Sequence, residues 1–239
     1  MAQPLSLKDQ TPVAKGLQRA IYTHPNDPTK LIKVLLPDPE THNRSGFGNL
    51  AERIFPALRA RHIRKEYLEY LRVMLANPAP DFQPPISHMY GFVSTDLGLG
   101  CLTEKICDAQ GHLAVTLRRL LDQGSLSDDH LSLLNDTVTR LYDLNIRASD
   151  LKPRNFVFGH RFEGSQQGPE TCVLIDGFGD IHAVPDRSLS RWTNHIGLDD
   201  SCSRMARGAL VWRAKARQFA RASSSSGGEE SNAETSRSD

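Results

Sequence analysis

The stretch that decides the fold is Arg147-Ala148-Ser149-Asp150-Leu151-Lys152-Pro153-Arg154-Asn155, followed downstream by Leu174-Ile175-Asp176-Gly177-Phe178-Gly179. An Asp, an Asn five residues later and a further Asp at the start of a glycine-containing turn are typical of sites that move a phosphoryl group from ATP. Such a site needs hard oxygen ligands for Mg²⁺ and a carboxylate that orients the attacking hydroxyl. We therefore expect Asp150 to be the catalytic carboxylate, and Asn155 and Asp176 to hold the metal.

Lys152 follows Asp150 by two residues and could reach the travelling phosphoryl group from the same turn. Pro153 would stiffen that turn. The alternative is an ordinary polar turn between a helix and a strand, because Asp, Asn and Pro all favour turns. The second motif, which begins with Asp176 after an apolar run, favours the functional interpretation.

These residues resemble the protein-kinase-like superfamily, whose catalytic loop reads His-Arg-Asp-Leu-Lys-Pro-x-Asn. From about Gly16 to about Arg221 the chain resembles the YrbL family more closely, the PhoP regulatory network proteins of Gram-negative bacteria. The residues that carry this resemblance are Ala20-Ile21-Tyr22-Thr23-His24-Pro25, Leu31-Ile32-Lys33-Val34, Arg64-Lys65-Glu66, Leu151-Lys152-Pro153-Arg154-Asn155 and Ile175-Asp176-Gly177-Phe178-Gly179. The resemblance implies a compact two-lobed kinase-like fold of the α+β class, with a small antiparallel-sheet N-lobe, a truncated helical C-lobe, and ATP and Mg²⁺ as cofactors.

Three more residues are candidates for binding the nucleotide. Lys33 lies in an apolar strand and would grip the α- and β-phosphates; the alternative is a lysine at a sheet edge that faces water. Its partner would be a helix glutamate, and we favour Glu66, with Glu69 and Glu52 as rivals. Glu104 would lie where the adenine ring meets the hinge backbone, although main-chain groups do the binding there.

The bulk composition limits the partners. The 239 residues carry 29 basic and 28 acidic side chains, so no excess of positive charge favours nucleic acid. We expect a nucleotide and an unknown small-molecule or protein acceptor as partners. The four cysteines show no Cys-x-x-Cys spacing, which favours free thiols, and neither a membrane-length apolar run nor a signal-peptide core is evident. We therefore expect a cytoplasmic protein.

The first part of the chain, residues 1–106, predicts the N-lobe. Strands are expected at Lys15–Tyr22 and Lys30–Leu36, and a hairpin at Met89–Thr95 and Cys101–Ile106. Between the two pairs a helical region, which Pro56 would break, ends before Asn77. Its apolar face is expected to hold Ile63, Tyr67, Tyr70, Leu71 and Met74.

Residues 107–221 predict the helical C-lobe, with Cys107–His112 as the hinge. Ser127 is expected to cap a helix whose first turn carries two aspartates. Short strands at Phe156–Phe158 and Cys172–Ile175 would flank a polar loop, Gly159–Thr171. The buried stripe of the Ser127-capped helix is expected to comprise Leu131, Leu134, Val138 and Leu141.

The last ordered helix is expected over about Cys202–Arg221 and is basic and amphipathic. The commoner interpretation is a helix packed on the C-lobe, and the alternative is weak contact with a membrane surface. The remaining residues, 222–239, are rich in Ser, Gly and Glu and are predicted to be disordered.

The chain departs from a working kinase in several places. No Gly-x-Gly-x-x-Gly cover is present, Gly177 separates Asp176 from Phe178, and Ala148-Ser149 replaces His-Arg. Few residues follow Asp176 outside the low-complexity tail, and Ala-Pro-Glu is absent from the sequence. Two hypotheses follow, namely a Mg-ATP phosphotransferase and a pseudokinase that acts as a regulatory interaction module in an envelope-stress (PhoP) network.

Overall fold

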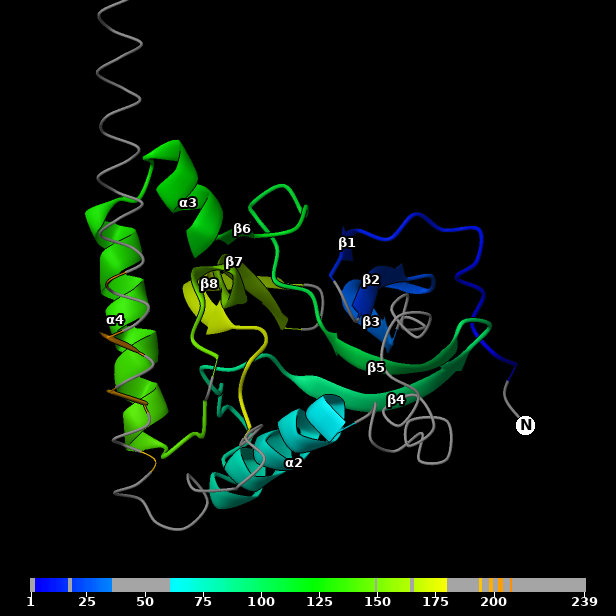
Figure 1. Ribbon diagram of the computed structural model, residues 1–239, viewed down its shortest axis with the longest axis horizontal. Coiled ribbons are helices and arrows are strands. Elements are labelled where there is room, and N and C mark those ends of the chain that lie inside the picture. The colour runs from blue at the N-terminus through cyan, green and yellow to red at the C-terminus, as the bar shows by residue number, and fades with distance from the viewer. Residues whose placement is uncertain are drawn as a thin grey trace, which may run out of the picture.

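The computed structural model describes residues 3–16, 19–35, 61–148, 150–163 and 166–179, together with 194, 198–199, 202–203 and 207. Within these residues the chain is of the α+β class, with two antiparallel sheets and three α-helices (Figure 1). The described part of the chain holds no helix with both the length and the apolar character needed to cross a bilayer.

The first sheet has five antiparallel strands in the order β1-β2-β3-β5-β4. Its strands are β1 (Ala14–Lys15), β2 (Arg19–His24), β3 (Asp27–Leu35), β4 (Met89–Thr95) and β5 (Gly98–Glu104). The predicted 89–106 hairpin is confirmed in its essentials.

The single strand predicted over 15–22 is wrong, because one strand ends at Lys15 and the next begins at Arg19. The N–H of Gly16 donates to the carbonyl of Arg19 at 2.8 Å, and Lys15 pairs with Ala20. The next strand begins at Asp27 rather than at Lys30, since Pro28 is tolerated near a strand start. This arrangement places Arg19 at the first position of β2.

Helix α2 (Arg61–Ala76) lies beside β4, where Tyr67 meets Phe92 edge to face at 5.3 Å between ring centroids. The predicted break at Pro56 lies outside the described residues. Ile63 and Val73 are buried as apolar residues should be, whereas Leu71 is exposed, so its assignment to the buried face is wrong. The buried face instead includes two glutamates, Glu66 and Glu69.

The second sheet has three strands, β6 (Val115–Thr116), β7 (Phe156–Glu163) and β8 (Gln166–Leu174), in that order. The polar loop predicted over Gly159–Thr171 is wrong, because β7 and β8 remain paired as far as Glu163 and Gln166. Much of that extension of β8 is exposed, so its side chains are polar and give no apolar signal for a strand.

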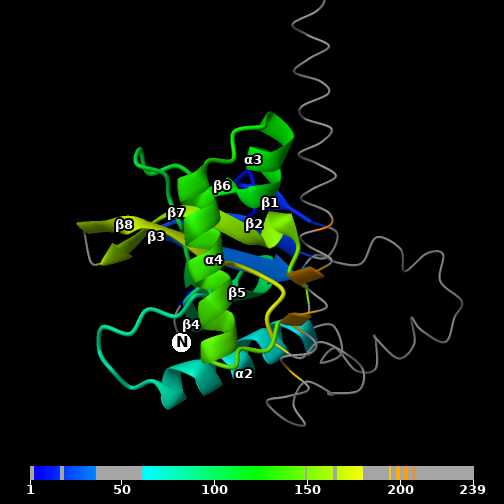
Figure 2. The same cartoon turned by 90° about the vertical axis from the view of Figure 1, so that its left-hand side faces the viewer.

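Two further helices precede the 3-10 turn Pro153–Asn155. Helix α3 (Leu117–Gln123) is capped by Thr116, and α4 (Asp128–Asp143) is capped by Ser127, as predicted. Figure 2 shows α4 standing across the second sheet, and the Thr137 hydroxyl donates to the Cys172 carbonyl on β8 at 2.8 Å. Of the predicted stripe on α4, Leu141 is fully buried and the others are partly buried.

The two sheets share a core. One cluster of buried side chains contains members from α2, β4, β5, α3, α4, β7 and β8. Main-chain bonds also join β8 to the segment that leads into β4, because Leu174 accepts from Ser87 N–H at 3.0 Å and donates to the Pro85 carbonyl at 3.0 Å. The Lys33 ammonium of β3 also donates to the Ile175 carbonyl, directly after β8, at 2.7 Å, and the candidate site lies there.

Candidate functional site

The two sequence motifs that predicted the site lie against each other. Asp150 N–H donates to the Gly177 carbonyl at 3.2 Å, and Gly179 N–H donates to the Arg147 carbonyl at 2.7 Å. Ala148 forms isolated bridges with Phe178 and Gly179. The segment 176–179 is thus paired with the chain around Asp150.

Asn155 is oriented by its own loop. Its side chain is 7% exposed, and Nδ2 donates to the Asp150 carbonyl at 2.8 Å. Because the amide nitrogen is used in this way, Oδ1 is the atom left to accept, and none of the described residues donates to it. Its own carbonyl accepts from Ile175 N–H at 2.8 Å, which places Asn155 beside the residue that precedes Asp176.

Gly177 allows the two motifs to approach each other closely. Its φ is +82°, a conformation that side chains other than hydrogen disfavour. A Cβ there would lie 2.5 Å from the Asp150 carbonyl oxygen and 2.9 Å from Asn155 Nδ2. The missing side chain lets the segment after Asp176 approach the Asp150 loop, residues 150–155, closely enough to pair with it.

Lys33 is not an edge residue. It lies on β3, between β2 and β5, and is 6% exposed. Its ammonium donates to the Ile175 carbonyl at 2.7 Å. This contact brings the lysine to the start of the Asp176 segment.

Glu66 pairs with a different cation from the one predicted. It is 3% exposed, and both of its oxygens accept from Arg19, at 3.1 Å from Nη1 and 3.2 Å from Nη2. Among the described residues no ion-pair contact joins Lys33 to Glu66, so the expected direct pair is wrong. Arg19 rather than Lys33 contacts Glu66 because two nitrogens of a guanidinium can donate two parallel bonds to the oxygens of one carboxylate.

Asp176 completes this cluster. Arg19 Nη1 also lies 3.5 Å from Asp176 Oδ2, and the Asp176 side chain is 41% exposed. Burial opposes its ionisation, but Lys33 and Arg19 hold the pKa of Asp176 well below its ordinary range. Asp176 is therefore ionised and accessible. We call Arg19, Lys33, Glu66 and Asp176 the acid–base cluster.

The pKa of Glu66 moves in the opposite direction. Burial and the neighbouring Asp176 carboxylate raise the pKa of Glu66 to about 7, even though Arg19 favours its charged form. Two carboxyls that share one guanidinium thus have well separated pKa values.

Glu69 and Glu104, two other residues considered from the sequence, have different duties. Glu69 accepts from Arg147 N–H at 2.8 Å and from the Arg72 guanidinium at 2.7 Å, so it ties α2 to the chain leading into Asp150 rather than to Lys33. Glu104 is buried in an ion pair with Arg161 at 3.2 Å and accepts from His88 N–H at 2.8 Å. Its side chain is not free to contact a ligand. The third rival, Glu52, lies outside the described residues.

Asp150 and Lys152 form an exposed pair. The Lys152 ammonium lies 2.9 Å from Asp150 Oδ1, and the lysine side chain is 55% exposed. Asp150 is partly exposed and Asn155 is not, so the surface of the Asp150 loop presents a carboxylate and an ammonium side by side.

A metal would find two oxygen ligands here. The residues described by the structure contain no cluster of three or more His, Cys, Asp or Glu side chains suited to a metal. The accessible Asp176 carboxylate and the uncommitted Asn155 Oδ1 nevertheless fit Mg²⁺, which keeps several waters and binds through few protein oxygens together with substrate phosphates.

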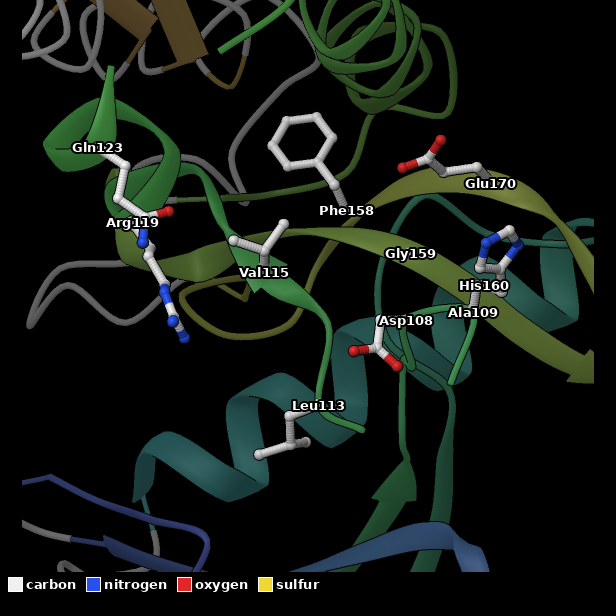
Figure 3. Close-up of a pocket in the computed structure, with 10 residues that line it drawn as sticks. All are labelled: Asp108, Ala109, Leu113, Val115, Arg119, Gln123, Phe158, Gly159, His160 and Glu170. Atoms are coloured by element: carbon white, nitrogen blue, oxygen red, sulfur yellow. The ribbon is translucent and has the colours of Figure 1, made fainter. Parts of the chain in front are cut away.

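A separate pocket of about 500 Å³ lies over the second sheet (Figure 3). Arg119 and Gln123 of α3, with Phe158 and His160 of β7, contribute to its wall. Asp108, from the segment predicted to be the hinge, also faces it. None of the residues predicted for the site lines this pocket.

Arg19 is the member of the cluster that the sequence did not single out. The sequence feature that could have indicated it is an arginine three residues after Gly16, within the first expected strand. The basic terminal helix proposed for membrane contact falls almost wholly outside the described residues.

Comparison with known proteins finds the family that the sequence motifs resemble. The family described as "PhoP regulatory network protein YrbL" matches residues 5–209. The chain belongs to this family. The matched span begins before the expected Gly16 and ends before the expected Arg221, and it contains the whole acid–base cluster and the Asp150 loop.

Two individual YrbL proteins are similar over most of their length. The uncharacterized protein YrbL of Escherichia coli (strain K12) and that of Shigella flexneri are each 27% identical to the chain over 191 residues. The match covers 79% of this chain and 80% of each relative. The description of the YrbL family connects it with a PhoP regulatory network.

Proposed function

We propose that the chain is a kinase-like phosphotransferase that uses Mg-ATP. The observation that carries the proposal is the pairing of the Asp150 loop with the Asp176 segment, which puts a partly exposed carboxylate, an uncommitted amide oxygen and a second accessible carboxylate within one small region. The element order supports it as well, because among the described residues a five-stranded antiparallel sheet with helix α2 precedes a helical part, in the manner of a kinase-like fold.

Each side chain has a task in this scheme. Asp150 accepts a hydrogen bond from the acceptor hydroxyl, and Lys152 brings positive charge to the same edge. Lys33 binds the phosphates from the side of the sheet. Asp176 and Asn155 would hold Mg²⁺, which when bound neutralises charge on the phosphates.

Binding is tested first. Thermal unfolding of the protein is measured with ATP, with and without Mg²⁺, for the natural chain and for Asp176→Ala. We expect Mg-dependent stabilisation of about 2.7 kcal/mol at ligand concentrations near a hundred times Kd, and loss of the Mg²⁺ dependence in the variant. Asp136→Ala, which removes an exposed carboxylate from α4, is the matched control. If Mg²⁺ has no effect on the natural chain, the proposal fails.

Turnover is tested separately. Asp150→Asn should lower kcat by roughly a thousandfold while leaving ATP binding in place, because it removes the carboxylate that orients the hydroxyl and no metal ligand. Release of labelled phosphate and labelling of added hydroxyl compounds are the measurements.

A regulatory pseudokinase is the second candidate. It is favoured by the absence of a Gly-x-Gly-x-x-Gly motif from the sequence and by the family's connection with a regulatory network. In this case the chain acts by contact with a partner rather than by turnover. ATP turnover that Asp150→Asn abolishes would exclude it.

A further inference from the structure

The turn between β1 and β2 is where the cover over the phosphates of a bound nucleotide would be expected in a kinase-like site. In this chain only two residues, neither of them a glycine, separate Gly16 from Arg19, and Gly16 N–H donates to the Arg19 carbonyl. A connection that short offers few backbone amides for a phosphate group. The position has a side chain instead, that of Arg19.

Arg19 and Lys33 converge on the same place from neighbouring strands. Arg19 pairs with Leu35 across the ladder and Lys33 pairs with Ile21, so the two cations are diagonal neighbours on one face of the sheet. Lys33 contacts the Ile175 carbonyl, and Arg19 contacts the carboxylate of Asp176. Both positive groups thus reach the segment that is proposed to bind metal and phosphate.

The Arg19 guanidinium still has donors to spare. A guanidinium carries five N–H groups, and three hydrogen bonds, two to Glu66 and one to Asp176, are formed here. No described residue accepts from the remaining donors. The Arg19 side chain is 13% exposed. Glu66 binds one edge of the guanidinium, and the other edge can contact a ligand. A planar fork of this kind suits phosphate oxygens.

We infer that Arg19 is a phosphate-binding residue of the site, in place of the glycine-rich cover, with the triphosphate of a nucleotide as its ligand. Glu66 orients the guanidinium, a duty different from the direct pairing with Lys33 that the sequence suggested. The inference rests on the proposed function, because the ligand it names is the ATP of that proposal.

The test compares ligands with and without phosphate. Calorimetric titration with Mg-ATP, adenosine and inorganic triphosphate is carried out on the natural chain, Arg19→Ala and Arg19→Lys. We expect Arg19→Ala to weaken Mg-ATP and triphosphate binding by about tenfold to a hundredfold, as for loss of a charge-assisted contact, with adenosine binding unchanged. Arg19→Lys, which keeps the charge and loses the fork, should fall between the two.

Arg118→Ala is the matched control, because it removes an arginine of an exposed ion pair with Asp122 on α3 and no member of the cluster. Unchanged Mg-ATP affinity in Arg19→Ala overturns the inference and leaves the proposed function standing. Equal weakening of ATP and adenosine also overturns it, since that pattern indicates a structural role. If Arg19→Ala does not fold, Arg19→Lys decides by the same criterion. A natural chain that binds none of the three ligands refutes the proposed function itself.

Discussion

Two groups of acidic and basic side chains in this molecule are similar in composition and differ in how far they are exposed to solvent. The interior ion pair, Glu104 and Arg161, is closed: Arg161 donates to the Gln83 side chain, to Glu104 and to the carbonyls of Pro84 and Ile86. The acid–base cluster around Arg19 is open, because Asp176 remains accessible and donors of Arg19 remain unused. An ion pair whose two side chains are both buried stabilises a fold, whereas one beside an accessible carboxylate indicates a binding site.

The sharpest test of this comparison is removal of each glutamate. Glu104→Ala leaves the Arg161 charge buried without its partner, so we expect the free energy of unfolding to fall by about 3 kcal/mol. Glu66→Ala should cost roughly 1 kcal/mol, because Arg19 keeps Asp176 and can reach water. Urea denaturation measures both, with the exposed Glu170→Ala as control. Equal costs for the two glutamates would contradict the distinction between the closed and open groups.

A second test concerns the close approach that builds the open cluster. Gly177→Ala should lower stability by about 2 kcal/mol, since it adds strain at φ +82° to a contact of 2.5 Å with the Asp150 carbonyl. Gly98→Ala is the control: its φ is +109°, but a Cβ there meets nothing within 4 Å, so only the strain of about 1 kcal/mol applies. Thermal unfolding compares them, and Gly177→Ala should also lose Mg-dependent ATP binding. If the two alanines cost the same, the contact with Asp150 is unimportant.

The smallest expected effect is in the pH dependence of stability. The pKa of Glu66 rises from 4.5 to about 7 on folding, so the unfolded chain loses this proton at lower pH than the folded chain does. The stabilisation is therefore complete below about pH 4.5 and is lost as the pH rises toward 7. Asp176, with its lowered pKa, stays ionised over this range.

Replacing Glu66 by Gln should remove a fall in the free energy of unfolding of about 1 kcal/mol per pH unit between pH 5 and 7. Urea titrations at several pH values in a chelating buffer measure it. Glu104, whose pKa burial also raises, keeps its own contribution in this variant. An unchanged slope in Glu66→Gln would mean that Glu66 does not titrate in this interval.

Local signals in the sequence predicted much of this arrangement. Ser127 was identified as a helix cap from its own chemistry and from the aspartates that follow it, and the structure confirms it. The pairing of the two motifs followed from strand ends brought together on one hairpin, and the structure brings Asn155 and Asp176 close in that way. These predictions depend on residues near one another in the chain or on a single hairpin.

The partner of Glu66 could not be predicted in the same way. Lys33 and Arg19 both lie near it only after the sheet and α2 have packed, and small differences in distance then decide which cation contacts the carboxylate. The burial of Val73 rather than Leu71 has a similar origin. Glu66 and Glu69 lie on the inner face of α2, so the buried face of the helix differs from the one that its apolar residues alone predict.

Gly179 acts as a spacer between α2 and the segment that follows Asp176. A Cβ at this residue would lie 2.8 Å from the Lys65 carbonyl oxygen and 3.1 Å from the Glu66 nitrogen. The width of one methyl group therefore sets how far the helix stands from the 176–179 segment. A larger residue here would push the helix backbone outward at the turn that bears Glu66. The position of Glu66, and with it the contact between Glu66 and Arg19, therefore depends on residue 179 being a glycine.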